Sequence, residues 1–262
     1  MKIASLQWSG IWEENRSDID SLHSKLSEIM GQRGPQAQKI DVVVLPELFH
    51  SGFSMHPERF TSMADELLSN LAKLAGLFGI YIIAGVAETE LDREDVIFRN
   101  SGWVFNPSGE RAARYIKQMP FSYINEQAVY LPGNQLCLFD VNGVMCTLFI
   151  CYDLRFPELF RKVAREVAVI FVIANWPESR QSHWETLLKA RAIENQCFIV
   201  GVNRVGRDGN DLNYIGGSMV INPLGEVLSY GQVTDEVILT EIETLQVQQV
   251  RKQFPFLQDM QD

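Results

Sequence analysis

A cysteine at the end of a predicted buried strand is the residue best suited to covalent chemistry. Cys151 follows the apolar run 144–150, which is typical of a central strand. A helical pattern opens at Pro157 and continues through LFRKVARE, so a sharp strand-to-helix turn is expected. Such an elbow can present the sulfur and nearby main-chain N–H groups to a reacting carbonyl. Taken alone, the stretch fits both a nucleophile and a buried structural cysteine.

Two further polar residues each follow an apolar, strand-like run. Glu47 comes directly after DVVVLP, and Lys117 stands where the run 110–116 ends. Read singly, such residues are usually solvated or held in structural ion pairs. Read with Cys151, they form a chemically complete set. A buried carboxylate can take the proton of a thiol, and an ammonium group can favour the thiolate and then stabilise an oxyanion.

The elements that must position these residues alternate between hairpins and strand–helix units. Hairpin turns are indicated at 106–109, 141–143 and 222–225. This mixture predicts an α/β protein with a mixed sheet, or two stacked sheets with helices outside. The turns at Asn106 and Asn222 share the pattern Asn-Pro-x-Gly-Glu, which is weak evidence for two similar halves. Strands are predicted at 2–8, 41–45, 80–87, 96–105, 110–116, 136–140, 144–150, 167–174, 197–203, 218–222 and 237–242, and helices at 17–30, 65–79, from 157 onward, 182–195 and near the C-terminus.

Composition limits the class of protein. The chain has 262 residues, with 46% apolar and 21% charged residues, which excludes a disordered or fibrous chain and suits a single domain over 1–262. A net charge of −10 argues against nucleic acid and anionic membranes as partners. No signal-peptide pattern or membrane-length apolar run is present, so a cytoplasmic location is expected. The cysteines lack CxxC spacing, which indicates neither a zinc site nor a disulfide framework: Cys137, Cys146, Cys151 and Cys197.

The motifs around these three residues resemble a known family. LPELF at Glu47, the lysine after Tyr115-Ile116, and CYDLRFPE at Cys151 are similar to the Glu–Lys–Cys motifs of the nitrilase superfamily of carbon–nitrogen hydrolases. The likeness spans essentially the whole chain, through NPSGE, ANWP, HWETLLKARAIENQ, NRVG and INPLGE. These later segments most resemble the omega-amidase branch, whose members remove the terminal amide of 2-oxoglutaramate and 2-oxosuccinamate.

The resemblance implies a fold and a set of roles. The fold is a four-layer α-β-β-α sandwich of the nitrilase type with mixed sheets, commonly paired into a homodimer, and the reaction uses no metal or cofactor. Cys151 attacks the amide carbon of a small-molecule amide substrate, and Glu47 carries the proton to ammonia and then activates water. Lys117 and the backbone N–H of Tyr152 hold the oxyanion. Glu126 orients the lysine, although without the resemblance it also fits an exposed loop acid.

Recognition of a substrate carboxylate requires a cation, for which Arg155 and Arg180 are the candidates. Arg155 fits equally a structural ion pair with Asp153 or Glu158. Arg180 follows ANWP and fits a surface position as well. Asp153, beside the nucleophile, is expected to cap the turn rather than to transfer protons.

Other residues are candidates for the pocket wall. Trp176, Phe49 and Phe53 suit either that wall or the core. Relatives often carry a histidine two residues after the lysine, where this chain has Met119. That departure leaves the triad intact, predicts an apolar pocket wall and leaves the identity of the substrate open.

Several alternatives remain. A Cys–His hydrolase would use His50, His56 or His183, although none of these follows a strand. A catalytically silent binding protein of the same fold is a second alternative. Within the superfamily, amidase action on deaminated glutathione, N-carbamoyl hydrolysis and nitrile hydrolysis also remain open. Leu154 stands where carbamoylases tend to have the first of two adjacent arginines, which counts against that activity.

Overall fold

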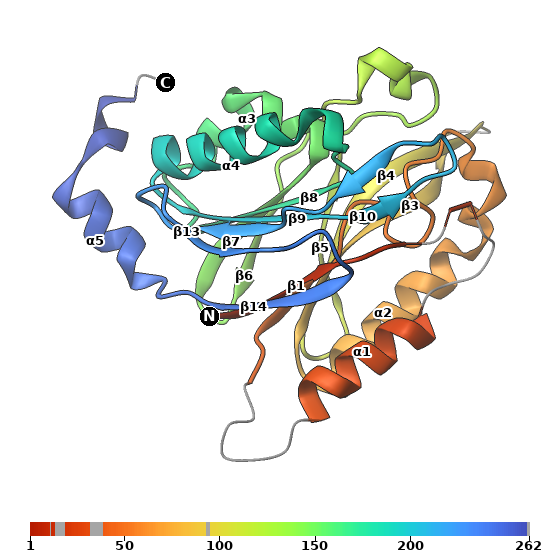
Figure 1. Cartoon of the computed structure of the whole chain (residues 1–262), viewed down its shortest axis with the longest axis horizontal. Coiled ribbons are helices and arrows are strands. Elements are labelled where there is room, and N and C mark those ends of the chain that lie inside the picture. Colours follow the sequence, from red (N-terminus) through yellow and green to blue (C-terminus); the bar gives the residue numbers. More distant parts are fainter. Residues whose placement is uncertain (11, 14–18, 32–38, 93–94, 261–262) are drawn as a thin grey trace.

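The computed structural model describes residues 1–10, 12–13, 19–31, 39–92 and 95–260. Two six-stranded sheets lie face to face, with helices on the outer side of each (Figure 1). The first sheet has the order β14 (Glu236–Glu241), β1 (Lys2–Gln7), β2 (Val42–Val44), β3 (Tyr81–Asp92), β4 (Asp95–Phe105) and β5 (Arg111–Ile116). The second has the order β13 (Val227–Tyr230), β12 (Met219–Ile221), β9 (Phe198–Asn203), β8 (Val169–Ala174), β7 (Val144–Ile150) and β6 (Leu138–Val141).

Helices complete the outer layers. Helices α1 (Ile19–Gly31) and α2 (Ala64–Phe78) pack on the first sheet, and α3 (Pro157–Arg161) and α4 (Gln181–Asn195) on the second (Figure 1). Helix α5 (Leu245–Gln253) precedes the C-terminus. Short 3₁₀ helices are η1 (Pro57–Arg59), η2 (Thr61–Met63), η3 (Ser122–Ile124), η4 (Glu126–Ala128), η5 (Cys151–Arg155), η6 (Glu178–Arg180) and η7 (Phe256–Asp259). Within the described ranges, none of the helices has the length and apolarity needed to cross a bilayer.

The core explains why the central strands are apolar throughout. Alternate residues of β2 face opposite layers: Val42 and Val44 pack between the sheets, whereas Val43 packs against α1 and α2. All six residues of β8 and of β9 are buried for the same reason. Because β1, β2 and β3 pair in parallel, as do β7, β8 and β9, both faces of these strands are covered. The predicted α-β-β-α sandwich with mixed sheets is confirmed.

The two sheets repeat one strand pattern. β1 to β5 pair as parallel, parallel, antiparallel and antiparallel, and so do β7, β8, β9, β12 and β13. The turn after the fourth strand of each set is the same. Asn106 Oδ1 accepts the N–H groups of Ser108 and Glu110, and Asn222 Oδ1 accepts those of Leu224 and Glu226. The shared sequence motif therefore marks equivalent turns in two similar halves.

Some local predictions differ from the structure. The chain after the nucleophile forms η5 and then only a short α3, because Pro157 can begin a helix but cannot extend one backwards. Strand β3 runs beyond the predicted end, to Asp92, because it pairs with β4 over its whole length. Strand β13 and the hairpin of β10 (Val205–Arg207) and β11 (Asn213–Ile215) are additional strands, too short to give a periodic signal.

Candidate active site

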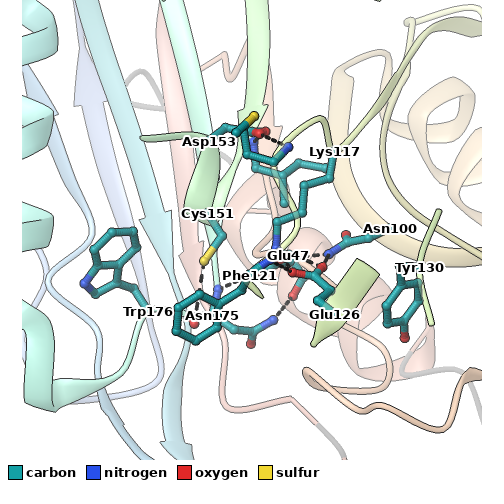
Figure 2. Close-up of polar contacts among 12 residues, drawn as sticks. Glu47, Asn100, Lys117, Phe121, Glu126, Tyr130, Cys151, Asp153, Asn175 and Trp176 are labelled. Carbon is teal, nitrogen blue, oxygen red and sulfur yellow. Dashed lines mark hydrogen bonds and ion pairs between the residues drawn. The ribbon is translucent and has the colours of Figure 1, made fainter. Parts of the chain in front are cut away.

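A lysine held between two carboxylates forms the centre of the site (Figure 2). The Nζ atom of Lys117 lies 2.9 Å from Glu47 Oε1 and 2.9 Å from Glu126 Oε2. The two glutamates are fully buried, and Lys117 is 2% exposed. Glu47 follows β2, Lys117 follows β5 and Glu126 begins η4. The structure therefore brings together three predicted residues, of which Glu47 lies 70 positions from Lys117 in the sequence.

Two asparagines, not identified from the sequence, fix these carboxylates. Asn100 Nδ2 donates to Glu47 Oε1 at 2.7 Å and to Glu126 Oε1 at 3.2 Å. The main-chain N–H of Asn175 donates to Glu47 Oε2 at 2.8 Å, and its side chain donates to the Glu47 carbonyl at 2.8 Å. Asn175 directly follows a strand-like apolar run, in the segment ANWP, and this position could have identified it as a candidate site residue. Asn100 lies inside β4, where a polar residue carries no such signal.

Cys151 stands on a strained elbow beside this cluster. Its φ of 47° lies in the left-handed region, which a non-glycine residue adopts only when the surroundings impose it. The sulfur lies 3.8 Å from the Asn175 carbonyl oxygen (Figure 2). Cys151 is partly exposed, whereas Cys137, Cys146 and Cys197 are buried. The elbow therefore presents to the pocket the one cysteine that the sequence singled out.

Charge states follow from burial and from the neighbouring carboxylates. Burial, together with Glu47, raises the pKa of Cys151 well above its usual range, although Lys117 acts in the opposite direction. The resting thiol is therefore protonated, and its reaction as a nucleophile needs a base. Burial disfavours the charge on Lys117, but Glu126 and Glu47 outweigh it and raise the lysine pKa well above its usual range. Lys117 is thus a permanent cation and cannot serve as that base.

A cavity of about 150 Å³ opens above Cys151 and Lys117. Its wall includes Tyr152 and the four residues predicted to bind substrate, which are Phe53, Arg155, Trp176 and Arg180. The ring centroid of Phe53 lies 5.1 Å from Lys117 Nζ. Aromatic and aliphatic side chains supply most of the remaining wall: Phe121, Tyr123, Ile124, Pro177, Leu212 and Tyr214. Such a lining is typical of a small-molecule site with a few polar groups that set orientation.

The pocket-wall prediction for Met119 was wrong, and Phe49 takes the core position that the sequence had left open as its alternative. Phe49 packs in the core beside Trp8, with ring centroids 6.5 Å apart, and does not line the cavity. Met119 packs against the core between the sheets rather than forming a pocket wall, because its main-chain N–H is bound to Asp153 at 2.8 Å. Met119 therefore does not contribute to the lining of this cavity.

The two arginines lie on aromatic faces at the cavity. The Arg155 guanidinium lies 4.9 Å from the centre of the Trp176 ring and donates to His183 Nδ1 at 3.2 Å. It does not pair with Asp153, which was one of the structural partners considered; Asp153 instead caps the elbow by accepting the Ile150 N–H at 2.9 Å, as expected. Arg180 lies 5.4 Å from the centre of the Phe121 ring.

Both guanidinium groups are available to an anion. Within the part of the chain that the structure describes, neither Arg155 nor Arg180 forms an ion pair with a carboxylate. A stacked guanidinium keeps its N–H edge free for bidentate contact with a carboxylate. The cavity thus has two cations that are able to bind a substrate carboxylate.

The histidines give no support to a Cys–His hydrolase. His50 is buried between Phe49 and Phe60, and neither ring nitrogen has a hydrogen-bond partner among the residues that the structure describes. His56 contacts Glu58 at 3.3 Å, and His183 contacts Arg155. A general base must lie within hydrogen-bond reach of the proton it removes.

Among the described residues, no group of three or more metal-ligating side chains is arranged around a common point.

Comparisons with known proteins agree with this geometry. The carbon–nitrogen hydrolase family matches residues 2–252. The chain is 32% identical to omega-amidase YafV of Escherichia coli over 260 residues, which are 99% of this chain and 96% of that protein. It is 34% identical to the 2-oxoglutaramate amidase of Bacillus subtilis over 230 residues, 86% of each chain.

A solved structure gives the same answer. XC1258 from Xanthomonas campestris, described as a CN-hydrolase superfamily protein with an arsenic adduct in the active site, has a TM-score of 0.89 and 31% identity to this chain. The match covers 100% of this chain and 97% of that one. The resemblance inferred from the motifs is confirmed, and the chain belongs to the carbon–nitrogen hydrolase family.

Proposed function

We propose that this protein hydrolyses the terminal amide of a small substrate that carries a carboxylate, in the manner of an omega-amidase acting on 2-oxoglutaramate or 2-oxosuccinamate. The single observation that carries this proposal is the Glu47–Lys117–Glu126 cluster at the base of a cavity that also exposes Cys151. The omega-amidase and 2-oxoglutaramate amidase relatives support the choice of substrate.

The first half of the reaction acylates the cysteine. Glu47 accepts the thiol proton as the sulfur attacks the amide carbon, so that a C–S bond forms and the carbonyl oxygen becomes an oxyanion. The Lys117 ammonium and the Tyr152 N–H stabilise this oxyanion. Glu47 then returns the proton to the departing nitrogen, the C–N bond breaks, and ammonia leaves a thioester on Cys151.

The second half releases the acid. A water molecule enters the position that ammonia has left and gives a proton to Glu47 as its oxygen attacks the thioester. The same oxyanion contacts form again, the C–S bond breaks, and Glu47 returns the proton to the sulfur. Glu47 therefore needs a fixed orientation through both halves, which its contacts with Asn100 and Asn175 supply.

An ammonia-release panel tests the proposed activity. The panel contains 2-oxoglutaramate, 2-oxosuccinamate, glutamine, deaminated glutathione, N-carbamoyl amino acids and simple nitriles. We expect the 2-oxo amides to react fastest, and mass spectrometry of quenched enzyme to detect an acyl group on Cys151. C151A should release no ammonia, whereas C197A, which changes a buried cysteine, should retain turnover. Equal rates on glutamine and 2-oxoglutaramate would refute the omega-amidase assignment.

We further propose that Arg155 or Arg180 binds the substrate carboxylate, and the variants R155M and R180M separate the two. Loss of the charge-assisted hydrogen bonds should cost about 1.5–3 kcal/mol, or roughly a 10- to 150-fold rise in KM for 2-oxoglutaramate. The rate on butyramide, which has no carboxylate, should change little. Equal losses on the charged and uncharged amides would contradict a role in carboxylate binding.

Three expectations from the sequence stay predictions: a single domain over 1–262, a homodimer and a cytoplasmic location. Limited proteolysis, light scattering and cell fractionation, respectively, test them.

A further inference from the structure

Asp153 connects the two chain segments that carry the catalytic groups. Its Oδ2 accepts the Ile150 N–H at 2.9 Å, on the residue directly before the nucleophile. Its Oδ1 accepts the Met119 N–H at 2.8 Å, two residues after Lys117. Its Oδ2 also accepts the Tyr115 O–H at 2.8 Å, two residues before Lys117. One fully buried carboxylate thus binds the chain on both sides of the lysine and next to the cysteine.

These contacts join the two sheets directly beneath the site. Tyr115 belongs to β5 of the first sheet, and Ile150 ends β7 of the second. The Tyr115 ring also packs edge-on against Phe149, with centroids 5.6 Å apart. A relative shift of the two strand ends would change the distance between the Lys117 ammonium and the Cys151 sulfur. Asp153 opposes that shift through hydrogen bonds to both strand ends.

Only a carboxylate can accept all three donors. An asparagine of the same shape has one oxygen and one NH₂ group. When the NH₂ group takes the place of Oδ1, two donors meet at the Met119 N–H. When the NH₂ group takes the place of Oδ2, two donors meet at the Ile150 N–H. In either orientation one main-chain contact is lost, so D153N opens the link on one side while preserving the volume of the side chain.

We propose that Asp153 is a positioning residue, which fixes the separation of the Lys117 ammonium and the Cys151 sulfur by linking the two sheets beneath them. This inference rests on the proposed roles of Lys117 and Cys151. In this proposal Asp153 touches neither the substrate nor the transferred proton. It acts through Tyr115, Met119 and Ile150, which lie close in sequence to Lys117 and Cys151.

Asp41 provides a control away from the site, because this partly exposed residue also links the two sheets, but at their opposite end. Its Oδ2 accepts the Lys2 N–H at 2.8 Å, and its Oδ1 accepts Asn142 Nδ2 at 3.1 Å. Asp41 precedes β2 and Asn142 precedes β7, whereas Glu47 and Cys151 follow these strands. D41N therefore reports on the general effect of weakening a link between the sheets.

The experiment compares D153N, Y115F and D41N on 2-oxoglutaramate, with folding checked by near-ultraviolet circular dichroism. A displacement of the catalytic groups should lower kcat of D153N about 100-fold, with KM within twofold of wild type. Y115F keeps both main-chain contacts and should show a smaller loss, also in kcat. D41N should retain both constants within twofold.

Each outcome decides the inference. If D153N matches D41N, or if its loss lies in KM, Asp153 is only a structural cap. If D153N does not fold, Y115F carries the test, and a wild-type kcat for Y115F overturns the inference. If C151A retains turnover, the proposed function itself fails. If C151A is inactive while D153N is fully active, only the positioning role of Asp153 fails.

Discussion

His50 is a buried group whose titration should lower the stability of the folded protein in mild acid. Burial lowers its pKa to about 4, from an ordinary value of 6.5. Its side chain packs between Phe49 and Phe60, the residue is 5% exposed, and in the described part of the chain neither ring nitrogen has a hydrogen-bond partner. The folded protein therefore holds this imidazole neutral, whereas the unfolded chain protonates it below pH 6.5. We expect H50F to remove this sensitivity to acid.

The sign and size follow from proton linkage. Between the two pKa values the unfolded state binds one more proton, so the free energy of unfolding falls as the pH falls. The contribution of the neutral imidazole to the free energy of unfolding is fully present above the unfolded pKa of 6.5. It is progressively lost as the pH falls to the folded pKa of about 4. Each pH unit below 6.5 costs about 1.4 kcal/mol, so the wild type should lose about 2 kcal/mol from this group between pH 7 and pH 5.

Urea unfolding of wild type and H50F at pH 7 and pH 5, at one protein concentration, measures this effect. Other titrating groups are common to both proteins and cancel in the difference, including Asp153, whose pKa burial raises to about 7. The free energy of unfolding of H50F relative to that of wild type should be about 2 kcal/mol higher at pH 5 than at pH 7. The control I82V changes a buried apolar side chain and should differ from wild type equally at both pH values. A difference between H50F and wild type that does not change with pH refutes the reasoning.

Two further variants test the support of the catalytic groups. Every hydrogen bond of the Glu126 carboxylate is accepted from a donor, so the NH₂ group of E126Q must face one of these donors. Lys117 should then lose its orientation, and kcat should fall about 100-fold in the ammonia assay. An unchanged kcat would count against Glu126 as the orienting residue. In G85A the new Cβ would lie 2.5 Å from Glu47 Cα, so both kcat and the unfolding temperature should fall. The control G76A meets its nearest atom at 3.5 Å on a helix and should gain about 1 kcal/mol of stability.

The sequence predicted the catalytic candidates because each follows an apolar run. Glu47, Lys117 and Cys151 come after β2, β5 and β7, and the end of a buried strand is where a polar residue is least explained by the core. The family resemblance added Glu126, which lies in a segment without periodicity. That the four residues meet depends on the stacking of the two sheets, which local patterns do not encode.

The contacts that hold the cluster together depend on strand register. Asn100 reaches both glutamates because β4 pairs with β3 so that Asn100 lies opposite Ala87. A single polar residue within a strand does not reveal this register. Met119 was misplaced for a related reason, since the direction of its backbone is set by Asp153, a residue 34 positions away.

The charged groups that line the cavity bear on how a substrate enters. Lys117 and Cys151 line the cavity, whereas Glu47 and Glu126 are fully buried and contact the lysine from outside the cavity wall. Arg155 and Arg180 line the cavity as well, and their proposed role is to bind the substrate carboxylate. Under that proposal the uncharged amide is the end that reaches Cys151, and the two arginines select which end of the substrate reacts.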